Sequence, residues 1–192
     1  MSALHLCIDM QIWEMKKFTP ENADSLRSAV TETAQKLEAN GVQTLYVAFT
    51  DALEFKRDPV GNMLGSFRMV QTALLKRGKE ALIDLFPSSN ALAATKTDYS
   101  AASARPIADF VSSVKPKRII LSGAWEATDA YYDTCCLTKT AVDFRKAGYE
   151  VSIVAEATNA TLKPSVDLAE RQRLHRPHGV KVEPLAAIMK SL

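Results

Sequence analysis

The stretch Leu4-His-Leu-Cys-Ile-Asp-Met-Gln11 starts as an apolar run and ends in polar residues. A short apolar run of this kind is typical of a strand buried in a parallel sheet. Thr19-Pro-Glu21 follows with an N-cap residue, a proline at the first helical position and an acidic first turn. Apolar residues then recur at spacings of three and four as far as Leu37, and Val42–Phe49 is the next apolar run. A strand, a helix and a second strand in this order predict a parallel sheet flanked by helices.

The same alternation continues to the end of the chain. Further strands are predicted at Ala91–Thr95, Arg118–Ser122, Val151–Ala155 and Gly179–Val182. Helices are predicted within Ser66–Phe86, over Ala104–Ser113, over most of Glu126–Ala147, and over Ser165–His175 and Pro184–Leu192, with Asp51–Gly65 irregular. No internal repeat, linker or low-complexity segment divides the sequence. We therefore expect residues 1–192 to form one α/β domain.

The composition excludes several classes of protein. A formal net charge of +2 and the lack of a basic face or binding motif argue against nucleic acid as a partner. Cys7, Cys135 and Cys136 do not form a disulfide framework, which indicates a reducing, cytoplasmic location. No apolar stretch approaches the length of a membrane span, so neither a membrane nor secretion is expected. The expected partner is a small-molecule substrate.

Polar residues or glycine follow several of the predicted strands. Asp9, Lys96 and Gly123 each come directly after an apolar run. In open parallel sheets the ligand crevice lies beyond the carboxyl ends of the strands, so these residues mark the place for chemistry. A lysine beside a buried carboxylate keeps its charge and helps to stabilise a thiolate. Taken singly, each has an ordinary alternative, because aspartate is common in turns and most lysines are solvated.

Cys136 is the candidate thiol. If a helix begins near Asp133 or Thr134, Cys136 lies in its first turn. The backbone amides and the helix dipole there lower the pKa of a thiol and can bind an oxyanion. The alternative is a small core residue on a buried helix, which is the commoner role of a free cysteine.

The order of these motifs resembles the isochorismatase-like cysteine hydrolases. The motifs are Ile8-Asp-Met-Gln11, Lys96-Thr-Asp-Tyr-Ser-Ala101, Ile119–Gly123, Cys136–Asp143 and Gly148-Tyr149, within a resemblance that runs from about Leu4 to Ala157. The resemblance implies a Rossmann-like, three-layer α/β/α sandwich around a six-stranded, mostly parallel sheet. With right-handed crossovers, the expected strand order is 3-2-1-4-5-6.

The resemblance also implies a chemistry: a cysteine-dependent hydrolase that cleaves a small amide or related C–N substrate through a thioester. Cys136 would be the nucleophile, Asp9 the proton acceptor and donor, and Lys96 the group that stabilises the thiolate. Backbone amides of Cys136 and the residue before it would form the oxyanion hole. We expect substrate contacts from Gln11, Trp13 and Tyr99.

One departure from the family pattern leaves an alternative open. Cys136 lies thirteen positions after Gly123, a longer spacing than the family has, with the insertion within residues 124–133. A second alignment matches Thr128-Asp-Ala130 to the residues before the nucleophile and puts Tyr131 in its place. Cys136 would then lie in the middle of a helix, and the protein would be a catalytically silent relative that acts as a binding or scaffold protein.

No metal or cofactor is expected. Nicotinamidase-type members carry an Asp-x-His metal motif after the second strand, whereas this chain has Thr50-Asp-Ala-Leu53. His175 and His178 are separated by Pro177 and are not joined by a carboxylate or thiol pattern, so a surface loop is the default interpretation. No glycine-rich phosphate loop is present. The apolar content of Ser66–Phe86 favours a homo-oligomer formed through that region or the C-terminal helices.

Overall fold

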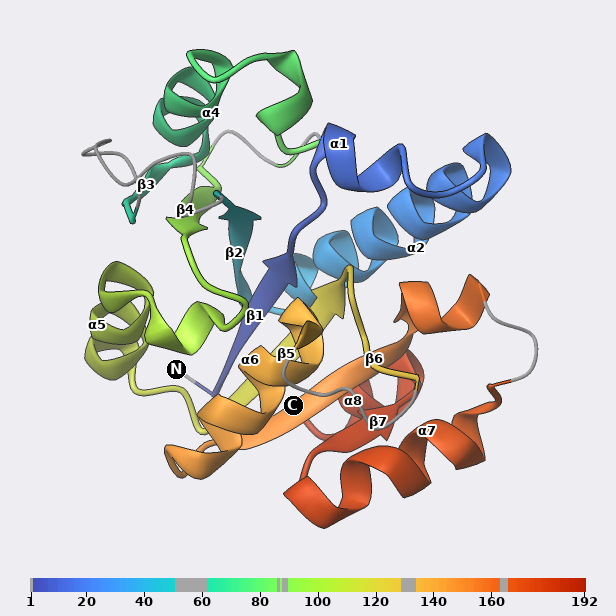
Figure 1. Ribbon diagram of the computed structural model, residues 1–192. Coiled ribbons are helices and arrows are strands. Elements are labelled where there is room, and N and C mark those ends of the chain that lie inside the picture. The colour runs from blue at the N-terminus through green and yellow to red at the C-terminus, as the bar shows by residue number, and fades with distance from the viewer. Residues whose placement is uncertain (1, 51–61, 86, 88–89, 129–133, 163–165) are drawn as a thin grey trace.

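The structure is a computed structural model that describes residues 2–50, 62–85, 87, 90–128, 134–162 and 166–192. A seven-stranded sheet in the order β3-β4-β2-β1-β5-β6-β7 forms its centre (Figure 1). The strands are β1 (Ala3–Ile8), β2 (Gln43–Phe49), β3 (Leu64–Ser66), β4 (Leu92–Lys96), β5 (Arg118–Gly123), β6 (Glu150–Thr158) and β7 (Lys181–Glu183). All neighbouring pairs are parallel except β3 and β4, which are antiparallel.

The six parallel strands have the predicted order 3-2-1-4-5-6 when they are counted along the chain. The strand β3 was not predicted, because three residues with a central glycine give no strand pattern. Thr95 holds this edge in register: its backbone N–H donates to Met63 O at 2.9 Å, and its Oγ1 accepts from Met63 N–H at 3.0 Å. The predicted sheet is therefore confirmed and gains one short antiparallel edge.

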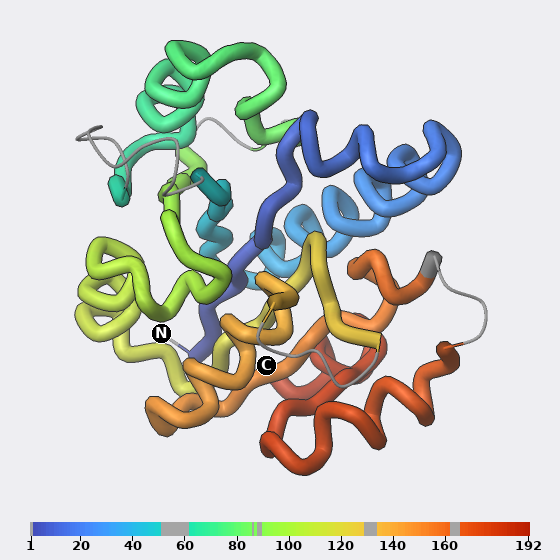
Figure 2. Tube along the Cα trace, in the orientation of Figure 1, coloured from blue at the N-terminus to red at the C-terminus, as the bar shows by residue number. Residues whose placement is uncertain are grey.

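Helices cover both faces of the sheet, so the three-layer arrangement is confirmed (Figures 1 and 2). On one face lie α2 (Pro20–Ala39), α4 (Phe67–Leu75) and α8 (Leu185–Lys190); on the other lie α5 (Arg105–Val114) and α6 (Cys136–Lys146). The remaining helices are α1 (Ile12–Met15) and α7 (Leu168–His175), with 3-10 turns η1 (Lys79–Ala81), η2 (Ala101–Ser103), η4 (Asn159–Leu162) and η5 (Arg176–His178).

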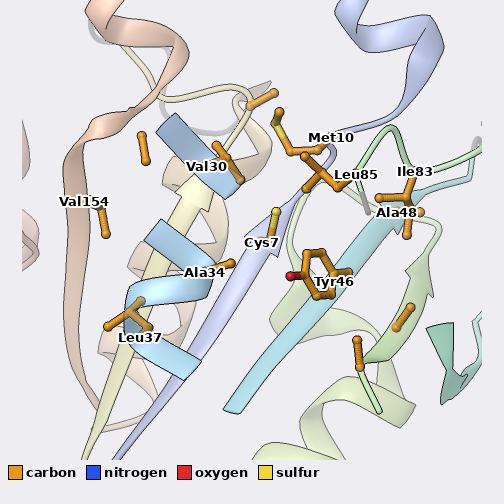
Figure 3. Close-up of a cluster of buried hydrophobic side chains, with 14 of the residues drawn as sticks. Cys7, Met10, Val30, Ala34, Leu37, Tyr46, Ala48, Ile83, Leu85 and Val154 are labelled. Atoms are coloured by element: carbon orange, nitrogen blue, oxygen red, sulfur yellow. The ribbon is translucent and has the colours of Figure 1, made fainter. Parts of the chain in front are cut away.

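The alternation of side chains along β1 supplies both layers of the core. Cys7 packs with Tyr46 and with Val30 and Leu37 of α2 (Figure 3). Leu4, Leu6 and Ile8 point to the opposite face, among residues of α5 and α6. Because successive strand residues face opposite ways, an apolar run in the central strand contributes to both cores.

The predicted helix over most of Glu126–Ala147 is wrong in its first part. The helix α6 begins at Cys136, and residues 126–128 are not helical. The cause is a long-range interaction: Glu126 is buried, and its carboxylate pairs with Arg171 of α7. Tyr131, the alternative nucleophile position, lies outside the described residues.

Three further expectations concern the surface of the protein. The expectation that His175 lies on a surface loop is wrong: it is fully buried and its Nε2 lies 3.2 Å from Glu126 Oε1.

Among the residues described, none of the helices is long and apolar enough to cross a membrane. Met69 and Leu75 of α4 are 48% and 51% exposed, but the homo-oligomer stays a prediction.

Candidate active site

Three of the predicted site residues come together at the carboxyl edge of the sheet. Asp9 directly follows β1, Lys96 is the last residue of β4, and Cys136 is the first residue of α6. Asp9 has a positive φ of 53°, and its N–H donates to Val47 O at 2.8 Å. A left-handed conformation at a non-glycine residue is unfavourable unless its surroundings enforce it. Contacts around Asp9 therefore hold the turn after β1 in a conformation in which Asp9 faces β4.

Lys96 and Asp9 form a fully buried ion pair. Lys96 Nζ donates to Asp9 Oδ2 at 2.9 Å and to the carbonyl oxygens of Asp98 at 3.2 Å and Tyr99 at 3.1 Å. It also lies 4.6 Å from the ring centroid of Phe49. Burial by itself would lower the pKa of Lys96, but the charge of Asp9, together with interactions with Cys136, more than offsets this and raises it. Lys96 is therefore the cationic partner of Asp9 in this buried pair.

Cys136 is only 4% exposed and lies within electrostatic and hydrogen-bonding reach of both Asp9 and Lys96. Burial raises the pKa of its thiol, and the negative charge of Asp9 raises it further, while Lys96 acts in the opposite direction. The expectation of an acidified thiol is therefore wrong. Of the two positions left open for Cys136, the first turn of a helix is the one observed. Desolvation and the neighbouring carboxylate nevertheless outweigh the helix dipole there.

Two sets of contacts hold the segments of the site together. Ala101 N–H donates to Thr140 Oγ1 at 2.9 Å, and that hydroxyl donates to Cys136 O at 2.7 Å. At Gly123, which has φ of 112°, a Cβ atom would lie 2.2 Å from Ile8 O. Only glycine permits this close approach of β5 to the end of β1. Residues of the Tyr-Ser-Ala, Ser-Gly and Cys-x-x-x-Thr motifs thus join the segments that carry Lys96, Asp9 and Cys136.

Gln11 has a structural position that its sequence context did not reveal. Its Nε2 donates to Phe49 O at 3.1 Å and to Ala81 O at 2.9 Å, and its Oε1 accepts from Phe49 N–H at 2.7 Å. The side chain is completely buried. These bonds join the end of β1 to β2 and η1, and the substrate contact expected of Gln11 stays a prediction.

Aromatic side chains line one side of the ion pair. Tyr99, 44% exposed, stacks on Phe49 with ring centroids 6.0 Å apart and planes 8° apart. Trp13 also packs near Phe49, at 6.3 Å between centroids. Trp13 and Tyr99, both predicted to contact substrate, thus neighbour the ring that lies against Lys96.

Two buried carboxylates near the site were missed. Glu14 of α1 accepts from Trp125 Nε1 at 2.6 Å and pairs with Lys17 at 2.9 Å. Burial raises the pKa of Glu14, and the charge of Asp9 contributes, although Lys17 and Trp125 oppose the shift. Glu126 is the second. Neither stood out in the sequence, because a single glutamate beside a tryptophan or in a four-residue helix carries no pattern.

The described residues do not fit a metal ion of the nicotinamidase type. Within those residues, no group of three or more His, Cys, Asp and Glu side chains could hold one. Asp9 is paired with Lys96, and His175 contacts Glu126. Asp51, in the stretch where the family motif would fall, lies outside the described residues. The expectation that the protein works without a metal therefore stays a prediction.

Comparisons with known proteins agree with this architecture. Among solved structures, an isochorismatase family protein from Desulfovibrio vulgaris is 20% identical, with a TM-score of 0.70 over 99% of this chain and 97% of its own. N-carbamoylsarcosine amidase from Thermoplasma acidophilum is 15% identical, with a TM-score of 0.66 over 96% and 97%. Pyrazinamidase of Pyrococcus horikoshii, in complex with zinc, is 18% identical, with a TM-score of 0.66 over 96% and 99%. No curated protein matched the sequence. The family model for the isochorismatase domain matches residues 3–175, and the chain therefore belongs to the isochorismatase family.

Proposed function

We propose that this protein is a hydrolase that uses Cys136 to cleave a small amide or a related C–N bond through a thioester. The observation that carries the proposal is the joint placement of Asp9, Lys96 and Cys136 in one buried cluster at the carboxyl edge of the sheet. Two structural neighbours are named as amidases, which agrees with this class of substrate. We also propose that residues 1–192 form a single domain.

The raised pKa of Cys136 determines how the first step would proceed. The thiol is neutral at rest, and Asp9 is beside it. As Sγ attacks the carbonyl carbon, its proton passes to Asp9, and the carbonyl oxygen becomes an oxyanion near the N-terminal amides of α6. Asp9 then gives the proton to the departing nitrogen, the C–N bond breaks, and a thioester remains.

Water completes the cycle. Asp9 takes a proton from a water molecule that attacks the thioester carbon, and the C–S bond breaks. The proton returns to sulfur, which restores the thiol and releases the carboxylic acid. Throughout both steps Lys96 keeps its charge and balances the negative charge that moves between Asp9, sulfur and the oxyanion.

The second candidate is a catalytically silent binding or scaffold protein. One observation favours it: Cys136 is almost fully buried and its pKa is raised, both of which lower the reactivity of a thiol. One element of that alternative is wrong, since Cys136 starts α6 and does not lie in the middle of a helix.

A substrate screen with two matched variants separates the candidates. Wild type, Cys136→Ala and Cys135→Ala are incubated with small amides, ureides and aryl carboxamides, and ammonia or amine release is measured. We expect turnover by wild type and Cys135→Ala and its loss, by at least a hundredfold, in Cys136→Ala, with the acyl-enzyme visible by intact-protein mass spectrometry. Equal turnover by Cys136→Ala would exclude the thioester route. A silent panel, with no thioester adduct on Cys136, would favour the binding protein.

A further inference from the structure

Glu126 is a buried charge outside the proposed catalytic cluster whose carboxylate has several hydrogen-bond partners. Its carboxylate accepts from Arg171 Nε at 3.0 Å and Arg171 Nη2 at 2.7 Å, and from Thr158 Oγ1 at 2.5 Å. His175 Nε2 lies 3.2 Å from the same group. Arg171 in turn donates through Nη1 to Ala155 O at 2.8 Å. The anchor of Glu126 is thus built from β6 and α7, and β6 is separated from β1 by β5.

The backbone around Glu126 contacts the helix on which the proposed nucleophile lies. Leu137 N–H donates to Trp125 O at 3.1 Å, and Ala127 N–H donates to Thr138 Oγ1 at 2.8 Å. Both partners belong to the first turn of α6, next to Cys136. Glu126 N–H itself donates to Asn159 Oδ1 at 2.7 Å. The segment 124–128 therefore joins the anchor on β6 and α7 to the start of the helix that carries the thiol.

This segment does not hold its conformation by local preference. Trp125 has φ of 66° and Gly123 has φ of 112°. A bulky residue in the left-handed region is unfavourable and persists only where surrounding contacts enforce it. The Trp125 side chain supplies two of these contacts, through Nε1 to Glu14 and by stacking on Phe18. The buried Glu126 carboxylate supplies more, to Arg171 and Thr158.

We propose that Glu126 is a positioning residue whose buried pair with Arg171 fixes the start of α6 and so orients Cys136 toward Asp9 and Lys96. This inference rests on the proposed role of Cys136 as the nucleophile. Buried ion pairs add little net stability compared with apolar residues, whereas several directed hydrogen bonds on one carboxylate fix geometry well.

The fold provides a matched control elsewhere in the sheet. Arg118, at the start of β5, pairs with Glu183, and Ser152 bonds to both groups. Glu126→Gln and Glu183→Gln each neutralise the acid of an Arg–Glu–hydroxyl cluster. Only the first cluster is joined to α6 through the bonds described above. A purely structural role predicts similar effects of the two variants on the site.

The test measures alkylation of Cys136 by chloroacetamide as a function of pH, with peptide mass spectrometry to separate it from Cys135. Among the residues that the structure describes, the charged groups that face the thiol are Asp9 after β1 and Lys96 at the end of β4. In Glu126→Gln the start of α6 loosens, water reaches the thiol, and its pKa falls toward the free value of about 8.5. We expect about a tenfold faster alkylation at pH 8, that is, a midpoint lower by about one unit. Glu183→Gln should match wild type within about twofold.

Equal alkylation profiles for wild type and Glu126→Gln, or equal shifts in both variants, would overturn the positioning role. If Glu126→Gln does not fold, Thr158→Val removes one bond to the same carboxylate and should shift the rate in the same direction by a smaller factor. Where a turned-over substrate is known, Glu126→Gln should lower kcat at least tenfold with KM changed less than about threefold. The alkylation profile needs no substrate, so its failure is distinct from failure of the thioester proposal, which the Cys136→Ala screen reports.

Discussion

Replacing Lys96 by methionine would leave Asp9 as an uncompensated charge in the core. Both side chains are fully buried, and Nζ lies 2.9 Å from Oδ2. Removing one partner of a buried ion pair costs about 3–5 kcal/mol, because the other charge stays desolvated. Two carbonyl acceptors, on Asp98 and Tyr99, lose their donor as well. We therefore expect Lys96→Met to lower the free energy of unfolding by about 4 kcal/mol at pH 7.

Urea unfolding followed by circular dichroism, with linear extrapolation, measures this loss. The double variant Asp9→Asn, Lys96→Met replaces the charged pair by neutral groups and should recover at least half of it, because the penalty comes from the unpaired charge. Lys139→Met is the control: its pair with Asp143 is partly exposed and should cost no more than about 1 kcal/mol. A loss below about 1 kcal/mol for Lys96→Met, or no recovery in the double variant, would refute the reasoning.

Two other residues give predictions of different kinds. Burial lowers the pKa of His5 from 6.5 to about 3, so only the unfolded chain takes up the proton as pH falls below 6.5. Stability should therefore drop by about 2 kcal/mol from pH 7.5 to pH 5 through this residue, and urea titrations at both pH values should show that His5→Gln removes this part of the slope; equal slopes would contradict it. Gly123→Ala should cost about 3 kcal/mol or more by thermal and urea unfolding and disturb the site, because its Cβ would meet Ile8 O at 2.2 Å. Gly148→Ala has a similar positive φ but open space around it, so an equal cost there would show that the close approach is unimportant.

The six parallel strands, although not β3, could be predicted from the sequence because the signals for them are local. Apolar runs ended by Asp9, Lys96 and Gly123 identify strands. The handedness of crossovers, together with the family resemblance, orders them. The start of the helix in Glu126–Ala147 was misplaced because it depends on a long-range contact. Glu126 fits a helical pattern in the sequence, but it pairs with Arg171, 45 residues further along the chain. The predicted direction of the Cys136 pKa shift was wrong, because desolvation depends on every segment packed around the thiol. No sequence motif encodes that packing.

The same raised pKa leads to a prediction in which two measurements move in opposite directions. Asp9 and Lys96 balance each other's charge, so a thiolate at Cys136 would add a second negative charge to a buried site. The thiolate is favoured only while its proton passes to Asp9, because the total charge of the cluster then stays constant. Asp9→Asn removes this acceptor and also removes the charge that raises the pKa of Cys136. The thiolate would then be the counter-charge to Lys96.

We expect Asp9→Asn to be alkylated at Cys136 by chloroacetamide at least severalfold faster than wild type at pH 8, yet to lose hydrolysis by a hundredfold or more, since nothing remains to protonate the leaving nitrogen. Asp143→Asn, which removes the acid of an ion pair on α6 away from the cluster, should change neither rate by more than about twofold. If alkylation and hydrolysis both fell in Asp9→Asn, Asp9 would act by holding the fold of the site. If both were unchanged, the proton transfer would pass through another group.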